Sequence, residues 1–105
     1  MNFGLKEIIL IEFQRIFSSF PMIDQVIIYG SRVKGTYKPG SDIDLTIKGK
    51  YIDYAMIAKV ELALDDLNLP YMIDITIYDK IKNQELIDHI DRIGVIIYCK
   101  AGFSE

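Results

Sequence analysis

The feature that most constrains this chain is a pair of β-prone segments joined by a turn-rich connection within residues 26–47. The first segment, 26–29, is apolar throughout, which is typical of a buried strand, and it ends in Gly30-Ser31. The second, 41–48, alternates between two faces: Ile43, Leu45 and Ile47 on one, and Asp42, Asp44, Thr46 and Lys48 on the other. The Tyr37-Lys38-Pro39-Gly40 turn joins the segments, so the Gly-Ser corner is expected beside the aspartates.

The rest of the chain predicts helices and strands in alternation around this pair. An apolar helical face predicts a helix over 3–20, which Pro21 ends, and a short helix is expected at 32–34. Further helices are expected at 53–67, with Asp53 as N-cap, and from the cap Asn83 to residue 92, where Gly94 serves as a C-terminal glycine. Strands are expected at 71–78 and 95–98. This order predicts an α/β (α+β) fold.

Length and composition narrow the class of protein. With 105 residues, half of them apolar, the chain is expected to form one domain spanning 1–105. The net charge of −3 gives no basic field for nucleic acid, so no direct nucleic-acid contact is expected. The lone Cys99, the absence of an 18-residue apolar run and the absence of a signal-peptide pattern predict a cytoplasmic protein with no membrane contact.

Some single residues have both a structural and a functional interpretation. Ile8 and Ile11 fall outside the apolar face of the first helix, and are either scattered surface residues or part of a patch that a partner covers. His89, the one histidine, lies at the rim of an apolar helix face, where packing is favoured over catalysis. Packing is likewise favoured for Tyr29.

Three aspartates lie on the polar phase of their strands and are expected to face a cleft. Asp42 and Asp44 point the same way, roughly 6.5 to 7 Å apart along the strand, and repel each other when both are ionised. A divalent cation removes this repulsion, and hard carboxylate oxygens suit Mg²⁺. Asp74 repeats the same phase on another strand and could complete a two-metal site. The alternative is that these are ordinary surface residues.

The Gly30-Ser31 corner could hold phosphate. Glycine lets a phosphate approach the backbone, free N–H groups at the start of a helix attract anions, and Ser31 adds a hydroxyl. Arg32, Lys34 and Lys38 lie close enough in sequence to neutralise a triphosphate, although each alone is better explained as part of a solvated turn. The chain has no GxxxxGK[ST] motif and so no P-loop.

The spacing of these parts is specific. Gly30-Ser31, ten residues (32–41) and then Asp42-x-Asp44 resembles the DNA polymerase β-type nucleotidyltransferase superfamily, and GSRVKGTYKPGSDIDL resembles its minimal nucleotidyltransferase (MNT) family. YMIDITIYD, which carries the third aspartate, and the ending HIDRIGVIIY extend the resemblance over essentially the whole chain. It implies a mixed sheet of about four strands flanked by helices.

The resemblance also implies roles for residues. Asp42 and Asp44 would ligate two Mg²⁺ ions, and Asp74 would ligate the catalytic ion and help to deprotonate an acceptor hydroxyl. Gly30 and Ser31 would hold the phosphates of a nucleotide, usually ATP, with support from Arg32. The reaction implied is transfer of NMP to a hydroxyl with release of pyrophosphate.

Proteins of the MNT family are commonly paired with a helical HEPN-family RNase toxin, so the resemblance implies an antitoxin that transfers AMP to a toxin tyrosine. Two alternatives stay open. One is a binding module that silences its HEPN partner by covering it, with a vestigial nucleotide site. The other is transfer to a small molecule, which is disfavoured because the chain is short.

Overall fold

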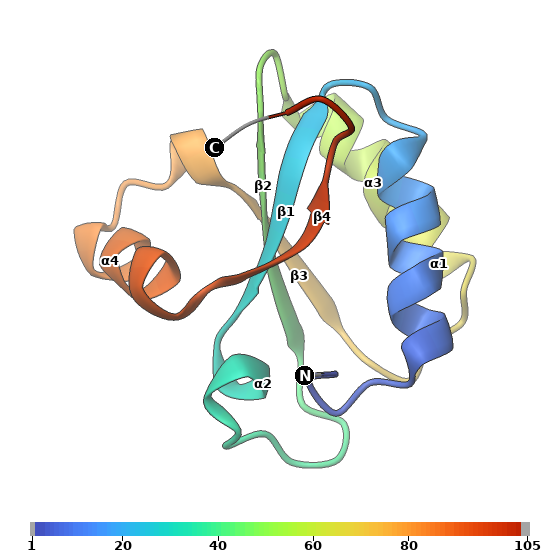
Figure 1. Ribbon diagram of the computed structural model, residues 1–105, viewed down its shortest axis with the longest axis vertical. Helices are drawn as coiled ribbons and strands as arrows, with labels where there is room; N and C mark the ends of the chain where they lie inside the picture. The colour runs from blue at the N-terminus through green and yellow to red at the C-terminus, as the bar shows by residue number, and fades with distance from the viewer. Residues whose placement is uncertain (1, 104–105) are drawn as a thin grey trace.

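The computed structural model describes residues 2–103 as an alternation of helices and strands around one sheet (Figure 1). All the predicted elements are present, with shifted ends. In chain order they are α1 (Glu7–Ser18), β1 (Ile23–Tyr29), α2 (Ser31–Lys34), β2 (Ile43–Gly49), α3 (Tyr54–Asp65), β3 (Ile73–Ile77), the 3₁₀-helix η1 (Tyr78–Lys80), α4 (Gln84–Ile93) and β4 (Val95–Cys99).

The four strands form one mixed sheet in the order β3-β2-β1-β4. β1 is antiparallel to both β2 and β4, whereas β2 and β3 are parallel, joined by the crossover helix α3. α1 and α3 lie on one side of the sheet and α4 on the other (Figure 1). This arrangement confirms the predicted α/β (α+β) fold, with a mixed sheet of four strands flanked by helices.

Alternation along the strands divides the apolar residues between the two faces. The larger cluster lies under α1 and α3, where Phe13 and Phe17 pack on Val26, Ile28 and the apolar phase of β2, all fully buried. The smaller cluster lies under α4 and contains Ile27, Tyr29 and Ile90. The polar phase of β2 shares this second face, but Thr46 is fully buried there. The expected cleft is therefore restricted to the end of the sheet that carries the aspartates.

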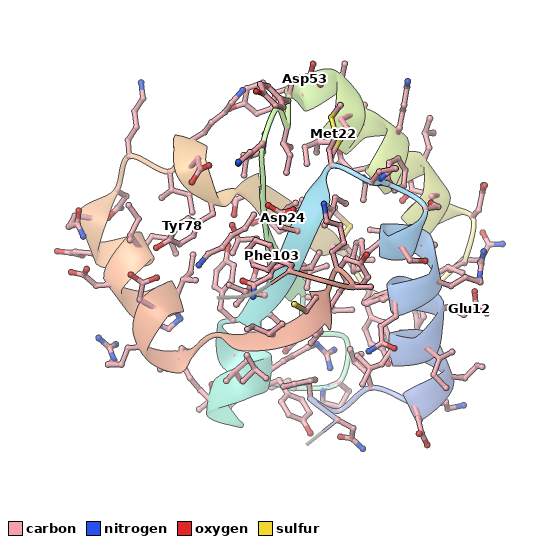
Figure 2. All side chains as sticks on the ribbon, turned by 45° about the horizontal axis from the view of Figure 1, so that its top comes forward. Glu12, Met22, Asp24, Asp53, Tyr78 and Phe103 are labelled. Atoms are coloured by element: carbon pink, nitrogen blue, oxygen red, sulfur yellow. The ribbon has the colours of Figure 1, made fainter. Side chains whose placement is uncertain are left out.

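Two helices begin at the residues that the sequence indicated. The Asp53 carboxylate accepts a hydrogen bond from the Met56 backbone N–H at 2.8 Å, and Figure 2 shows Asp53 at the start of α3. Asn83 Oδ1 accepts hydrogen bonds from the backbone N–H groups of Glu85 and Leu86. Both side chains satisfy donors that have no partner within the helix.

Two expectations about helix ends were wrong. α1 begins at Glu7 and not at residue 3, because Phe3 has a positive φ of 60° and is buried with Leu5 as a folded-back segment. Gly94 ends α4 with φ −59° and ψ 146°, so it does not adopt the left-handed conformation of a C-terminal glycine. Glycine is needed there for space, because a Cβ would lie 2.6 Å from Ile27 Cγ2 and 2.5 Å from the Ile90 carbonyl oxygen.

The surface of α1 is partly apolar. Ile8 and Ile11 are 58% and 49% exposed, as their position outside the apolar face predicted. Gln14, on the same helix, reaches the edge of the sheet, where its Nε2 donates a hydrogen bond to the Ile97 carbonyl of β4 at 3.1 Å. Within the described residues, no helix is long and apolar enough to cross a membrane.

Candidate active site

Tyr29, Asp44 and Asp74 form a row across three neighbouring strands. Asp44 on β2 is the register partner of Tyr29 on β1 and of Asp74 on β3. Register partners present their side chains on the same face of a sheet, so all three belong to the face that α4 partly covers. The sheet thus brings Asp44 and Asp74 together from positions 30 residues apart.

Asp42 lies one residue before β2, two positions before Asp44. The pKa of Asp44 is raised above its ordinary value, chiefly by burial and then by the negative charges of Asp74 and Asp42. No basic side chain in residues 2–103 forms an ion pair with any of the three aspartates. Among the described residues, the negative charge at this end of the sheet is therefore not paired with a basic side chain.

Three carboxylates with uncompensated charge are a donor set that suits a hard divalent cation. Across residues 2–103, however, no three His, Cys, Asp or Glu side chains converge closely enough to hold a single ion. The donor chemistry fits Mg²⁺, and the carboxylates would have to move closer together to coordinate it. Asp42, Asp44 and Asp74 as metal ligands stay a prediction on this geometry.

Gly30 and Ser31 follow β1 directly and lie at the start of α2. Gly30 has φ 81° and ψ −153°, a conformation that is essentially restricted to glycine, and its Cα faces the Asp44 carboxylate closely. The predicted phosphate corner is therefore in contact with the central aspartate of the row. Phosphate binding by Gly30 and Ser31 itself stays a prediction.

Arg32 has a different environment from the one predicted. It is 3% exposed, with Nη1 donating to the Phe3 carbonyl at 2.9 Å and Nε and Nη2 donating to the Ser41 carbonyl at 3.2 and 2.8 Å. Its guanidinium also lies over the rings of Tyr37 and Tyr71. These contacts tie the connection before Asp42 to α2 and to the N-terminal segment, and they give no support to the predicted contact between Arg32 and a triphosphate.

Tyr29 and His89 pack as the sequence favoured. Tyr29 is 6% exposed, and its ring meets the His89 imidazole edge-on at 6.1 Å between centroids. Burial is the main cause that raises the pKa of Tyr29, and a side-chain hydrogen bond with Thr76 opposes it. Thr76 shares the polar phase of Asp74, and this shared phase is the signal in the sequence that could have identified Thr76 as a neighbour of the aspartates. Figure 2 shows Tyr78 near α4, where its hydroxyl donates to Asp91 at 2.6 Å.

The solved structures that superpose on this chain include complexes of a toxin with an antitoxin. A chain of "Crystal structure of the toxin-antitoxin with AMP-PNP" superposes with a TM-score of 0.68 and 18% identity over 92% of this chain and 76% of that chain. A chain of "Crystal structure the toxin-antitoxin MntA-HepT" has a TM-score of 0.67 and 11% identity over 90% of this chain and 74% of that chain. At these identities the likeness establishes the fold.

No match was found among curated proteins. The family model described as "Polymerase beta, Nucleotidyltransferase" matches residues 12–102, which include β1, the Gly-Ser corner and all three aspartates. The chain therefore belongs to the polymerase beta nucleotidyltransferase family.

Proposed function

We propose that this protein transfers AMP from ATP to a hydroxyl group, most specifically a tyrosine of a HEPN-family RNase toxin, and so acts as an antitoxin. The observation that carries the proposal is the pairing of Asp44 with Asp74 in register on parallel strands, with Gly30 pressed against Asp44. Residues 1–105 act in this proposal as a single nucleotidyltransferase domain.

The chemistry requires an activated hydroxyl and a neutralised triphosphate. The hydroxyl oxygen attacks the α-phosphorus of ATP, a new P–O bond forms, and the bond to the pyrophosphate oxygen breaks with its electron pair leaving on pyrophosphate. Asp74, on the outermost strand of the row, accepts the hydroxyl proton. Gly30 and Ser31 bind the β- and γ-phosphates. Asp42 and Asp44 would hold two Mg²⁺ ions, and Asp74 would ligate the catalytic one; bound there, the ions would supply positive charge to neutralise the phosphates.

The structural neighbours support the choice of partner. Both structures described above are named as toxin–antitoxin complexes, and one of them contains AMP-PNP, an analogue of ATP. The exposed Ile8 and Ile11 on α1 give this chain an apolar surface that a partner protein could cover. In these neighbouring structures a toxin and an antitoxin occupy one complex. We infer that a toxin bound to this chain in the same way would be its acceptor.

The test is incubation of the protein with ³²P-α-labelled ATP, Mg²⁺ and the product of the adjacent gene, which the proposal expects to be a HEPN-family toxin. Label is expected on the toxin, and is lost with Asp44→Asn or with EDTA. Asp66→Asn, at the exposed C-terminal end of α3, is the matched control and keeps the activity. Absence of label with the wild-type protein, or equal label with Asp44→Asn, contradicts the proposal.

A non-catalytic antitoxin is the second candidate, favoured by the absence of a ready-made group of three metal-binding side chains in residues 2–103. It makes a different prediction in cells. Neutralisation of the toxin survives simultaneous replacement of Asp42, Asp44 and Asp74 by Asn if covering the toxin is sufficient, and is lost if AMP transfer is required.

A further inference from the structure

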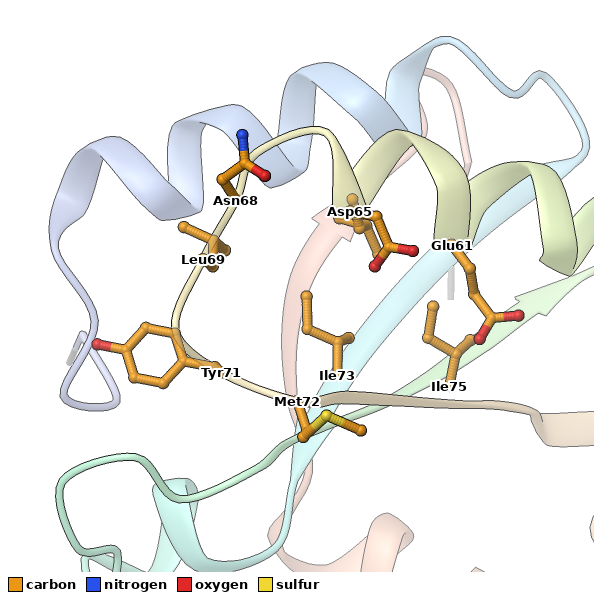
Figure 3. A pocket seen from close by; sticks show the side chains of 9 residues that line it. Glu61, Asp65, Asn68, Leu69, Tyr71, Met72, Ile73 and Ile75 are labelled. Atoms are coloured by element: carbon orange, nitrogen blue, oxygen red, sulfur yellow. The ribbon is translucent and has the colours of Figure 1, made fainter.

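β3 is the last strand of the sheet, so one of its edges has no neighbour among the described residues. A groove of about 350 Å³ runs along this edge between β3 and the C-terminal half of α3 (Figure 3). Leu64, Ile73 and Ile75 supply apolar surface, and the side chain of Met72 beside them is 73% exposed. An open edge of this kind is a template for another strand.

The direction of the free backbone groups follows from one hydrogen bond. The Ile43 N–H of β2 donates to the Met72 carbonyl at 2.8 Å, so the backbone at even positions of β3 faces β2. Backbone groups alternate in direction along a strand. The N–H and C=O groups of Ile73 and Ile75 therefore face outward, one on each side of Asp74, and are ready to pair.

The rim of the groove is acidic. Figure 3 shows the Asp65 carboxylate above Ile73 and the Glu61 side chain descending from α3 to lie beside Ile75. Neither carboxylate has an ion-pair partner in the part of the chain that the structure describes. An added strand would place alternate side chains directly beneath this rim, so Lys or Arg is favoured there, with the aliphatic stem on the isoleucines.

The register of an added strand on β3 determines which of its side chains lies beside Asp44 and Asp74. A residue opposite Asp74 presents its side chain on the face of Asp44 and Asp74, with Cβ atoms roughly 5 Å apart between strands. Its two neighbours lie opposite Ile73 and Ile75 and present their side chains to the groove, beneath Asp65 and Glu61. One extended segment thus meets the acidic groove and the aspartate row at once.

We propose that the open edge of β3 binds the acceptor as an extended polypeptide segment in which the hydroxyl-bearing residue is flanked on both sides by Lys or Arg. The proposal rests on the proposed function for the chemistry, but the docking itself needs no nucleotide. The opposite edge of the sheet is less suited, because Gln14 already occupies the Ile97 carbonyl of β4 and that strand is two strands away from Asp44.

The test uses two fluorescein-labelled peptides, SVKYRVS and SVEYEVS, with the full-length protein at low ionic strength and without nucleotide. Fluorescence anisotropy is expected to show binding of SVKYRVS roughly 3- to 30-fold tighter than binding of SVEYEVS, the range for two exposed charge pairs. The double variant Glu61→Lys/Asp65→Lys reverses this preference. Equal binding of the two peptides, or an unchanged preference in the double variant, overturns the proposal.

The control is Asp66→Lys/Glu85→Lys, which changes the net charge equally on exposed residues outside the groove. It keeps the preference for SVKYRVS. If it reverses the preference as fully as the groove variant does, binding follows net charge and the groove is not the site.

Strand pairing is tested with two further forms of SVKYRVS, each carrying two N-methyl groups. In one form the backbone nitrogens of the Lys and the Arg are methylated. In the other form the methyl groups are on the Tyr and on the second Val, two residues after the Tyr. Because donors alternate along a strand, one form loses binding by at least roughly 10-fold and the other does not. Equal effects of the two forms rule out pairing along β3.

A final comparison separates docking from catalysis. Binding of SVKYRVS by Asp44→Asn at wild-type affinity supports docking that is independent of the metal site. If wild-type protein binds SVKYRVS but transfers no AMP to it or to the toxin, the proposed function fails and docking stands. If the toxin is labelled equally well by wild-type protein and Glu61→Lys/Asp65→Lys, docking at β3 fails and the proposed function stands.

Discussion

Gly30 and Asp44 approach so closely that any side chain at position 30 would collide with the aspartate. A Cβ built on Gly30 would overlap Asp44 Oδ2, and the backbone there has φ 81° and ψ −153°. We expect Gly30→Ala to displace the Asp44 carboxylate and to lower the free energy of unfolding by roughly 1–3 kcal/mol, the range for such strain. Urea unfolding and the rate of AMP transfer measure the two effects.

Gly40→Ala is the control for Gly30→Ala. Gly40 has a similar φ of 82°, but a Cβ there would have no atom within 4 Å. It is therefore expected to lose stability through backbone conformation alone and to keep its transfer rate. Equal loss of transfer in the two variants means that the contact between Gly30 and Asp44 is unimportant.

Replacement of Asp44 by Asn tests the charge at the centre of the row. Burial, followed by the charges of Asp74 and Asp42, raises the pKa of Asp44 above 3.8. A raised pKa in the folded state means that stability present below pH 3.8 is lost as the pH rises through the folded pKa. In EDTA, Asp44→Asn is thus expected to be more stable than wild type at pH 7 and nearly equal to it at pH 3.

Urea unfolding at pH 3, 5 and 7 follows this difference. Asp66→Asn, outside the row, is expected to show no comparable gain between pH 3 and pH 7. A variant Asp44→Asn that is less stable than wild type at neutral pH would show that the carboxylate has a structural role that its surroundings do not indicate.

Arg32 is expected to stabilise the fold. Arg32→Ala leaves the carbonyls of Phe3 and Ser41 without their donors, and we expect a loss of roughly 2–4 kcal/mol in urea unfolding. Lys34→Ala, an exposed cation on the same short helix, should change stability by about 0.5 kcal/mol or less. Unchanged stability of Arg32→Ala together with a raised KM for ATP would restore the phosphate role that the sequence suggested.

His89 provides a single NMR probe, since the chain has one histidine. Burial, followed by the positive charges of Lys34 and Arg92, lowers the pKa of His89 below 6.5. Its contribution to stability is therefore present above pH 6.5 and lost as the pH falls through the lower folded value. The imidazole proton signals should titrate below 6.5. Lys34→Gln should raise the midpoint, whereas Lys38→Gln should not, and a midpoint above 6.5 contradicts the packing described.

Local signals predicted the fold well. The caps Asp53 and Asn83 and the alternation in β2 depend only on neighbouring residues, and each acts as expected. The two-residue alternation also predicted that Asp44 and Asp74 lie on the polar faces of their strands, because this alternation depends only on neighbouring residues. The family resemblance implied the mixed sheet, which these local signals do not indicate, and the structure shows that its parallel pair is β2 and β3.

Features that depend on distant residues were less predictable. Nothing near Arg32 in the sequence indicates that the Phe3 carbonyl, 29 positions away, lies against its guanidinium. Gly94 has the position of a C-terminal glycine, but the reason for it is the approach of Ile27 from β1. The register that sets Asp44 opposite Asp74 likewise joins residues 30 positions apart, and no local pattern encodes it.

The hydrogen bond from Gln14 to Ile97 makes the two edges of the sheet unequal. A sheet with two open edges can join copies of itself edge to edge without limit, which leads to filaments. Here the Ile97 carbonyl of β4 already accepts a hydrogen bond from Gln14, whereas β3 has no neighbouring strand on one side among the described residues. Copies that pair through one edge alone would stop at a dimer, so this difference between the edges disfavours a growing chain of copies.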